Sequence, residues 1–329
     1  METLIDSGRA AIERGARIIQ SGGIVAFPTE TVYGLGACAY DAEAISAVFA
    51  AKGRPMDNPL IVHLADSKDI SDVSAGYDSR YEPLIEKFMP GPLTLVVKKR
   101  GDVPDCVTAG LDTVGVRVPS HAVAREFISA CGVPIAAPSA NLSTKISPTT
   151  AYHVFEDMNG RIPLIIDGGD CDVGIESTVL DITGDVPVIL RPGAVTAEQI
   201  ASVLGQVKTH DGKVIAAAPA PGMKYKHYAP SCDCVVASSP DSAMQEYGRR
   251  AAAGGNPVIL CIREHMGIYA GFDVVDLGSG EDEICRNIYA AMHGAEKRYD
   301  CIICEDLGHS GVLASVMNRV NKSAGGKII

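Results

Sequence analysis

The sequence predicts an α/β fold, in which short buried strands alternate with helices, followed by a second and smaller α/β unit. Short apolar runs bounded by Gly and Pro alternate with segments of helical spacing, which is typical of a sheet flanked by helices. A length of 329 residues favours two domains over one. The composition changes near residue 208, where an Ala- and Pro-rich stretch separates two such patterns.

The first part opens with a helix over residues 6–20, whose apolar side chains have helical spacing and which ends at Ser21-Gly22-Gly23. Residues 23–27 (GIVAF) then form an apolar run that indicates a buried strand. A helical pattern begins near Asp41. Further strands are expected at residues 60–64, 93–98, 114–119, 134–137, 163–166, 177–182 and 186–190, and helices at 41–51, 81–88, 122–130, 148–158 and 196–203.

A linker is predicted between the two units. Residues 216–222 (AAAPAPG) suit neither a helix nor a strand interior, and the surrounding segment carries more Lys than Asp. The second unit shows strand patterns at 234–237, 257–262, 272–277 and 300–304, separated in part by helical patterns at 242–253 and 283–297, a rhythm typical of a small parallel sheet. The expected boundaries are 1–207, a linker at 208–232, and 233–329.

Composition excludes several classes of protein. The formal net charge of −11 argues against a chain that mainly grips phosphate backbones, and the absence of Trp, with aromatics at 5%, leaves few stacking platforms for single-stranded nucleic acid. Ten cysteines fall partly in apolar runs and no secretory signal opens the chain, so free thiols in the cytoplasm are expected. No apolar run approaches the roughly 20 residues that span a bilayer.

Residues 28–36 (PTETVYGLG) are the most informative stretch. Three hydroxyl side chains and one carboxylate lie beside two glycines, directly after the strand at 23–27. Glycine lets the backbone approach a ligand closely, so this pattern indicates recognition of a small polar molecule. The alternative is an ordinary turn between a strand and a helix.

Four cations border predicted strands in this acidic chain: Lys52, Arg54, Arg117 and Arg191. Lys and Arg with Gly and Pro around them suit phosphate oxygens, Arg through its fork and Lys as a point charge. Arg117 stands within an apolar strand and therefore needs an anion, either a protein carboxylate or a ligand. A solvated basic turn at residues 52–60 is the alternative, and His63 within its strand fits a satisfied histidine as well as a ligand contact.

Several familiar motifs are absent. The chain has no Gly-x-x-x-x-Gly-Lys-Ser/Thr phosphate loop, no Gly-x-Gly-x-x-Gly after its first strand and no Gly-x-Ser-x-Gly elbow. Cys301-Ile302-Ile303-Cys304 and Cys232-Asp233-Cys234 have metal or redox spacing, but no further pair accompanies them at ligand spacing, so both are interpreted as structural.

Taken in order, these motifs resemble those of the L-threonylcarbamoyladenylate synthases in their two-domain form. The resemblance rests on residues 28–36, 52–60, 115–119, 138–141, 176–180 and 190–193, and on His227-Tyr228-Ala229-Pro230 in the linker. It covers essentially the whole chain, and the ordered set is highly specific. It implies a YrdC-like twisted mixed sheet with flanking helices, plus a small Rossmann-like C-terminal domain.

The resemblance implies a nucleotidyltransferase reaction. L-threonine, bicarbonate or CO2, and ATP give L-threonylcarbamoyl-AMP and pyrophosphate, and the product serves threonylcarbamoylation of adenosine 37 in tRNA. A downstream tRNA threonylcarbamoyl transferase is the implied partner, with weak or indirect tRNA binding and no membrane. Such chemistry needs positioning and charge stabilisation rather than a covalent nucleophile, and a Mg2+ bound mainly through the phosphates fits it.

The resemblance also assigns individual residues. Lys52, Arg54 and Arg117 take the catalytic role, and no residue is assigned to bind metal. The threonine site is Thr31, His63, Arg117, Ser139 and Ser177, and the ATP site is Lys52, Arg54, Asn58, Thr113, Asn141, Ser147, Arg191 and Tyr228. Because Tyr228 lies in the linker, the linker is expected to fold over the active site as a lid that excludes water.

Three other hypotheses compete with this interpretation. A YrdC-like domain could act as an RNA-binding module, which the acidic charge and the few aromatic residues argue against. A carbamoyl transferase of hydrogenase maturation would need acylphosphatase and zinc-finger-like regions for which this chain has no room. The C-terminal domain could also have a structural or regulatory role of its own.

Overall fold

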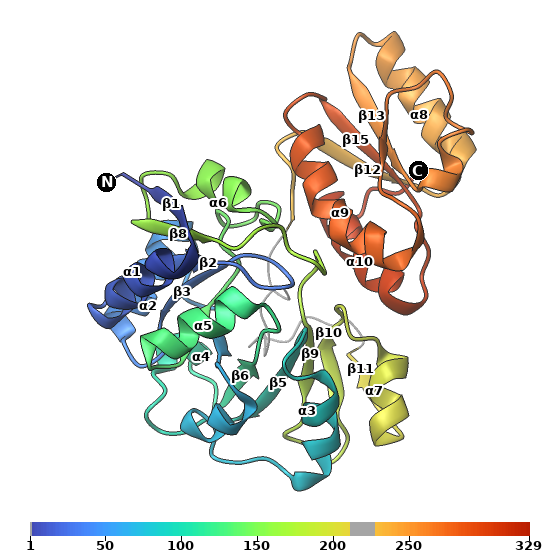
Figure 1. The fold of residues 1–329 in the computed structure, drawn as a ribbon. Helices are drawn as coiled ribbons and strands as arrows, with labels where there is room; N and C mark the ends of the chain where they lie inside the picture. Colours follow the sequence, from blue (N-terminus) through green and yellow to red (C-terminus); the bar gives the residue numbers. More distant parts are fainter. Residues whose placement is uncertain (1, 211–227) are drawn as a thin grey trace. The chain divides into compact units, whose positions relative to one another are not determined.

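The computed structural model describes residues 2–210 and 228–329, which form two compact units (Figure 1). The first unit comprises the described residues up to 143 together with 148–172 and 176–210. The second comprises 144–147, 173–175 and 228–329. Two short segments from within residues 1–207 thus belong to the second unit, which contiguous sequence boundaries do not anticipate.

The first unit contains a mixed sheet of eleven strands in the order β1-β8-β2-β3-β7-β4-β6-β5-β9-β10-β11. Its strands are β1 Leu4–Ser7, β2 Val25–Phe27, β3 Gly34–Cys38, β4 Ile61–His63, β5 Leu93–Lys98, β6 Thr113–Arg117, β7 Ile135–Ala137, β8 Leu164–Asp167, β9 Thr178–Asp181, β10 Val188–Arg191 and β11 Lys208–Thr209. Its α-helices are α1 Gly8–Gln20, α2 Ala42–Lys52, α3 Glu82–Phe88, α4 Asp105–Thr108, α5 Ala122–Cys131, α6 Ala151–Met158 and α7 Ala197–Leu204, with 3-10 turns at Ser67–Asp72 and Ser79–Tyr81.

Alternate residues of the strands face two hydrophobic cores on opposite sides of the sheet. Val25 and Phe27 pack with α1 and α5, whereas Ala26 between them packs on the side of α2 and α6. The same alternation continues in β6, where Val114 and Val116 belong to the α2 side. Arg117, next in that strand, therefore points to the opposite face.

The first half of the chain contains two strands that were not expected from the sequence. Residues 28–36 do not simply lead from a strand to the helix near Asp41. Instead, β3 (Gly34–Cys38) begins inside this stretch and pairs antiparallel with β2, with Phe27 opposite Gly34. Glycine-rich GLGAC lacks the β-branched residues that mark a strand, and a Cβ at Gly36 would come within 2.6 Å of the Ile135 side chain, so close packing with β7 requires glycine there. The other unexpected strand is the short edge strand β1.

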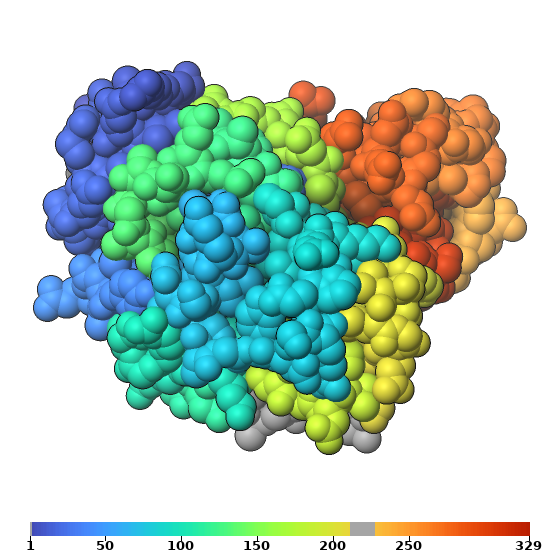
Figure 2. Space-filling view, turned by 60° about the horizontal axis from the view of Figure 1, so that its bottom comes forward, coloured from blue at the N-terminus to red at the C-terminus, as the bar shows by residue number. Residues whose placement is uncertain are grey.

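Helix ends in the first unit follow local sequence signals. The Asp41 side chain accepts hydrogen bonds from the backbone N–H groups of Glu43 and Ala44 at the start of α2, and α2 ends at Gly53 with a φ of 60°. The α7 helix begins with a capping box between Thr196 and Gln199 and lies beside α3, as Figures 1 and 2 show. Capping places Lys52 at the last turn of α2, where it enters the candidate site.

The second unit is built on a four-stranded parallel sheet in the order β12-β15-β13-β14. This confirms the predicted small parallel sheet. Its elements are β12 Asp233–Ala237, α8 Pro240–Ala252, β13 Pro257–Cys261, a 3-10 turn at Arg263–His265, β14 Val274–Asp276, α9 Gly280–Ala295, β15 Cys301–Glu305 and α10 Gly311–Ser323.

All ten cysteines lie within the described residues and are free thiols. Cys301 and Cys304 are fully buried in β15, as expected for a core strand. Among residues 2–210 and 228–329, no helix is both long and apolar enough to cross a membrane.

Candidate active site

The connection between β2 and β3 is held by a short network of threonine hydroxyls. Thr29 Oγ1 donates to the carbonyl oxygen of Val32 at 2.6 Å and accepts from the backbone N–H groups of Thr31 and Val32 at 3.2 Å. The hydroxyls of Thr29 and Thr31 lie 2.9 Å apart, and both side chains are buried. Thr29 thus fixes the turn, and Thr31, which was assigned to the threonine site, is held next to it.

Glu30 projects from this turn to Arg117 at the end of β6. Its carboxylate oxygen lies 2.8 Å from Nη2 of Arg117, and both side chains are 4% exposed. Arg117 Nε also donates to the carbonyl oxygen of Gly91 at 3.3 Å. The sequence left open whether Arg117 pairs with a protein carboxylate or with a ligand. In the structure it pairs with the carboxylate of Glu30.

His63 is the neighbour of Arg117 in the adjacent parallel strand. Strand register places the two residues opposite each other, and both lie on the face of the sheet away from Val62. The His63 ring packs edge-on against Phe27, and its Nδ1 lies 3.1 Å from the carbonyl oxygen of Ile61. Burial, reinforced by the charge of Arg117, lowers the pKa of His63 to about 3, so the imidazole is neutral near pH 7.

Lys52 forms a second group with the segment after β7. Its Nζ donates to the main-chain oxygens of Ser139 and of Asn141, the latter at 2.5 Å, and Ser143 N donates back to the Lys52 carbonyl at 2.9 Å. Ser139 Oγ donates to Oδ1 of Asn141 at 2.6 Å. Burial lowers the pKa of Lys52 well below its usual range, and the charge of Arg54 acts in the same direction.

Arg54 and Asn58 follow Lys52 in the chain. Arg54 Nη2 donates a hydrogen bond to the Asn58 carbonyl oxygen at 3.3 Å. The guanidinium carbon of Arg54 lies over the Phe49 ring, 5.6 Å from the ring centroid. The Asn58 side chain is fully buried, yet neither its amide nitrogen nor its amide oxygen has a hydrogen-bond partner among the described residues. A buried amide in that state is costly unless a ligand supplies the partner, which suits a binding site.

Arg191 and Ser177 make a third group, at β9 and β10. Arg191 Nη2 donates to the carbonyl oxygen of Ser177 at 2.8 Å and to its hydroxyl at 3.2 Å. That hydroxyl also lies 2.8 Å from Oγ1 of Thr94 in β5. A Cβ at Gly193 would come within 2.3 Å of the Thr178 nitrogen, so glycine is required for this close approach of β9 and the end of β10.

Strand register shows which groups come together. Residues 91–92 link the first group, at Arg117, with the third, since Gly91 O accepts from Arg117 and Pro92 O accepts from the Thr178 N–H. His63, in contrast, pairs with Ile135 at the start of β7, and Ser139 follows the other end of that strand. The connection 28–33 contacts both regions, because Glu30 reaches Arg117 while the Tyr33 carbonyl accepts from the Ala140 N–H.

The three remaining assigned ATP residues are Thr113, Ser147 and Tyr228. Thr113 is half-buried at the start of β6, opposite Lys98 of β5. Ser147 and Tyr228 belong to the second unit: Nε2 of His293 lies 3.3 Å from the Ser147 carbonyl, and the Tyr228 ring stacks on Tyr289 at 5.7 Å. His227 and the predicted lid at 211–227 lie outside the described residues.

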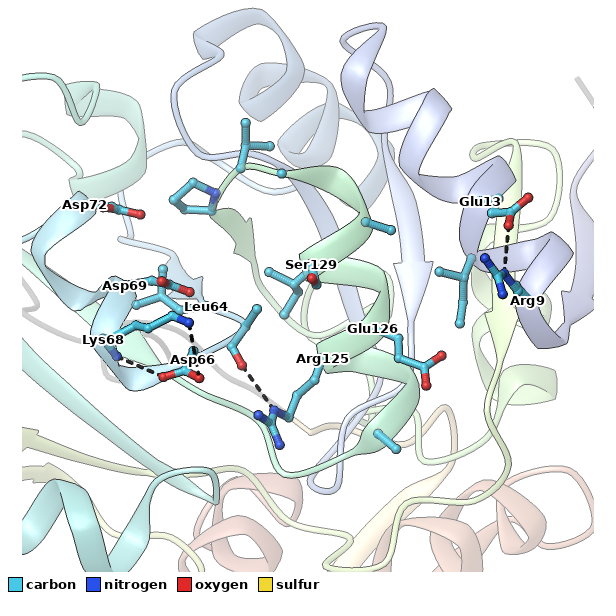
Figure 3. A pocket seen from close by; sticks show the side chains of 18 residues that line it. Arg9, Glu13, Leu64, Asp66, Lys68, Asp69, Asp72, Arg125, Glu126 and Ser129 are labelled. Carbon is cyan, nitrogen blue, oxygen red and sulfur yellow. Dashed lines mark hydrogen bonds and ion pairs between the residues drawn. The ribbon is translucent and has the colours of Figure 1, made fainter.

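A cavity of about 1050 Å3 is hollowed beside α5 (Figure 3). Charged side chains with partners border it: Arg125 donates to the Ala65 main-chain carbonyl, and Lys68 forms an ion pair with Asp66. None of the assigned site residues lines it. The candidate site is therefore not in this cavity.

Sequence reasoning missed two contributors. Neither Glu30 nor Thr94 was among the residues assigned to the threonine or ATP site. The signal for Glu30 was a carboxylate between two threonines after a strand, and the signal for Thr94 was a hydroxyl in a mostly apolar strand. Neither signal reveals its partner, because both partners come from strands distant in sequence.

Comparison with known proteins adds independent information. The family model of Sua5, YciO and YrdC, described as "Telomere recombination", matches residues 17–193, and the model described as "Threonylcarbamoyl-AMP synthase, C-terminal domain" matches residues 195–325. The threonylcarbamoyl-AMP synthase of Pyrococcus abyssi is 42% identical, with 99% of each chain covered. That of Bacillus subtilis is 41% identical, with 97% of this chain and 94% of that protein covered.

The chain belongs to the threonylcarbamoyl-AMP synthase family. Its fold agrees with solved structures: the crystal structure of P. abyssi Sua5 complexed with L-threonine has a TM-score of 0.92 and 41% identity, covering 100% of this chain and 99% of that one. Escherichia coli YciO, at 23% identity and a TM-score of 0.51 over 58% of this chain, shares the fold of the first unit. Family membership confirms the fold class predicted from the sequence and the prediction of a nucleotidyltransferase that makes threonylcarbamoyl-AMP for tRNA modification.

Proposed function

We propose that L-threonine and ATP bind side by side on the face of the first unit's sheet that carries Arg117 and Arg191. The single observation that carries this assignment is that two buried arginines are connected by hydrogen bonds: Arg117 to residues 91–92, these to Thr178, and its neighbour Ser177 to Arg191. Buried guanidinium groups suit anions that arrive from solution, and the substrates bring a carboxylate and a triphosphate.

On the threonine side, Arg117 takes the carboxylate, and Thr31, His63, Ser139 and Ser177 surround the rest of the amino acid. The neutral imidazole of His63 can accept or donate a hydrogen bond to the threonine hydroxyl without adding a second cation. Its burial against Phe27 excludes water from the methyl group. The site would therefore read both the hydroxyl and the methyl of threonine.

On the ATP side, Lys52 and Arg54 take the phosphates, with Arg191 at the opposite border. Asn58, Thr113, Asn141, Ser147 and Tyr228 hold the remainder of the nucleotide. The unpartnered Asn58 amide supports this, since it offers both a donor and an acceptor that no described residue uses.

The chemistry follows from this arrangement. The threonine amine combines with CO2 or bicarbonate to form a carbamate, and a carbamate oxygen attacks the α-phosphorus of ATP. A P–O bond forms there, the bond from the α-phosphorus to the bridging oxygen breaks, and pyrophosphate leaves. Cations stabilise the charge that develops on the phosphates, so no covalent nucleophile is needed.

A magnesium ion would be held through the phosphates of ATP. Within the described ranges, no three His, Cys, Asp or Glu side chains gather as metal ligands, and binding through phosphates requires no such cluster. Mg2+ would neutralise phosphate charge. The product would pass to a tRNA threonylcarbamoyl transferase.

The test is turnover with single amino acids. The purified chain is incubated with ATP, labelled bicarbonate and one amino acid, and pyrophosphate is measured together with the labelled adenylate. Threonine should support formation of both products. Equal turnover with serine, or without an amino acid, would contradict the assignment of the threonine site.

A further inference from the structure

Glu30 is a buried carboxylate that the assigned roles do not use. It is 3% exposed, and the guanidinium of Arg117 lies 2.8 Å from one of its oxygens. Neither oxygen accepts a hydrogen bond from any described residue. The same holds for Arg117 Nη2, which approaches Glu30 without hydrogen-bond geometry.

This state is costly for a group that serves only the fold. An ionised carboxylate has about four acceptor positions, and burying it is unfavourable unless paired charges and hydrogen bonds fill them. A single ion pair leaves most of those positions empty. Both members of the Glu30–Arg117 pair therefore keep hydrogen-bonding capacity for a third group.

The turn that carries Glu30 is held in place on both sides. Thr29 Oγ1 bonds three backbone groups of the turn, and Tyr33 N donates to the Pro148 carbonyl at 2.9 Å. The Tyr33 hydroxyl donates to the Gly169 carbonyl at 2.7 Å. Glu30 is thus presented by a fixed backbone, which is how a binding residue is positioned.

We propose that Glu30 binds the α-amino group of the amino-acid substrate while Arg117 binds its carboxylate. This rests on the proposed function, which places threonine at Arg117, and adds the residue that recognises the other end of the zwitterion. A primary ammonium offers three N–H donors, and Glu30 has the empty acceptor positions to receive them. A buried cation and a buried anion in contact match the two charges of a free α-amino acid.

The alternative is that Glu30 only holds Arg117 in place. The two roles differ in which ligands feel the loss of the carboxylate. A positioning role affects every ligand that uses Arg117, whereas an amine-binding role affects only ligands that carry an amine. Neighbouring groups support the latter, because neutral His63 and the buried Cys171 thiol, whose pKa burial raises, supply no second cation for Glu30.

The experiment measures binding by isothermal titration calorimetry with the full chain and two probes. The probes are L-threonine and its 2-hydroxy analogue, in which a hydroxyl replaces the α-amino group. Glu30→Gln should weaken binding of L-threonine by about tenfold or more, because a charge-assisted contact is lost. It should leave binding of the 2-hydroxy analogue unchanged or tighter, because Arg117 loses a competing carboxylate.

Glu126→Gln, on the exposed face of α5, is the matched control and should bind both probes as the wild type does. Equal weakening of both probes by Glu30→Gln would overturn the proposal in favour of a positioning role. Unchanged binding of L-threonine would overturn it as well.

A measurement on the wild type keeps the proposal testable even where Glu30→Gln does not fold. The wild-type chain should bind the 2-hydroxy analogue at least about tenfold more weakly than L-threonine. Equal affinity of the wild type for the two probes would contradict the role of Glu30 without contradicting the assignment of the threonine site. Failure of the wild type to bind L-threonine at all would instead contradict the proposed function itself.

Discussion

Nζ of Lys52 lies 2.5 Å from the main-chain oxygen of Asn141, and it also donates to the main-chain oxygen of Ser139. The end of α2 and the segment after β7 are therefore joined by a buried cation. Ser143 N closes the same junction by donating to the Lys52 carbonyl at 2.9 Å. An ammonium has three donors, so this arrangement leaves one N–H for a phosphate oxygen.

Replacing Lys52 should therefore reduce both stability and turnover. Lys52→Met keeps the apolar stem but leaves two main-chain oxygens without a donor, and removal of the buried charge offsets part of that loss. We expect the free energy of unfolding in urea to fall by about 2 kcal/mol and turnover to be lost. Lys68→Met, at an exposed lysine, is the control. Unchanged stability would show that the two contacts contribute nothing to the fold.

The two phosphate-site arginines should behave differently. Arg54 is half-buried, and its Nη2 donates a 3.3 Å bond to the Asn58 carbonyl within its own loop. Arg54→Ala should therefore reduce kcat by about a hundredfold, the scale of one charge-stabilising donor, and change the unfolding free energy by less than about 1 kcal/mol. Near-normal pyrophosphate release would refute its phosphate role.

Arg191 should show both effects. It is 6% exposed and its Nη2 bonds the carbonyl and the hydroxyl of Ser177, so Arg191→Ala leaves a buried carbonyl without its donor. We expect a loss of about 2 kcal/mol in urea unfolding along with the loss of turnover. Arg191→Lys keeps the charge but not the fork, and should recover stability better than turnover. Equal recovery of both would argue against a role in orienting phosphates.

The low pKa of His63 predicts how the free energy of unfolding depends on pH. Its pKa is about 3 in the folded chain and 6.5 in the unfolded chain, so the unfolded state binds more protons between these values. The contribution of neutral His63 to the free energy of unfolding is fully present above pH 6.5. It is lost as the pH falls from 6.5 toward 3. We expect about 2 to 3 kcal/mol less stability from this residue at pH 4.5 than at pH 7.

The variant His63→Gln isolates this effect. Glutamine does not titrate, so urea unfolding of the variant should lose about 2 to 3 kcal/mol less than the wild type between pH 7 and pH 4.5. Identical pH dependence of the two proteins would mean that other groups cause the acid sensitivity.

Much of the fold could be predicted because its signals are local. Apolar runs gave β2, β4 and β5 close to their bounds, and the end of α2 follows from Gly53. The strand β3 could not be predicted, since GLGAC has no strand propensity and forms a strand only because glycine lets β2 and β7 approach. Its pairing is a tertiary effect.

The candidate site shows the same limit. The sequence placed polar and charged side chains beside predicted strands but did not show how these strands are paired. In this mixed sheet His63 and Ser139 lie at opposite ends of neighbouring antiparallel strands, and the turn at Glu30 connects the two regions across the face. Glu30 and Arg117 are 87 residues apart in sequence, so no local pattern encodes their pairing.

Tyr228 gives a last prediction, within the second unit. Its ring stacks on Tyr289 at a centroid distance of 5.7 Å and an interplanar angle of 22°, and its carbonyl accepts a hydrogen bond from Ser323 Oγ at 2.6 Å. Its φ of 64° is unfavourable for a residue with a side chain, so these contacts must hold it. A double-mutant cycle with Tyr228→Ala and Tyr289→Ala should give a coupling of about 1 kcal/mol in urea unfolding.

The control pair is Tyr228→Ala with Tyr247→Ala, because Tyr247 packs against Phe272 instead. These two changes should add without coupling. If Tyr228 contacts ATP, Tyr289→Ala should also raise the KM for ATP while leaving the KM for threonine nearly unchanged. The reason is that the substitution removes the Tyr289 ring, which holds the Tyr228 ring in position. A coupling near zero, or equal changes in both KM values, would contradict this role of the stacked pair.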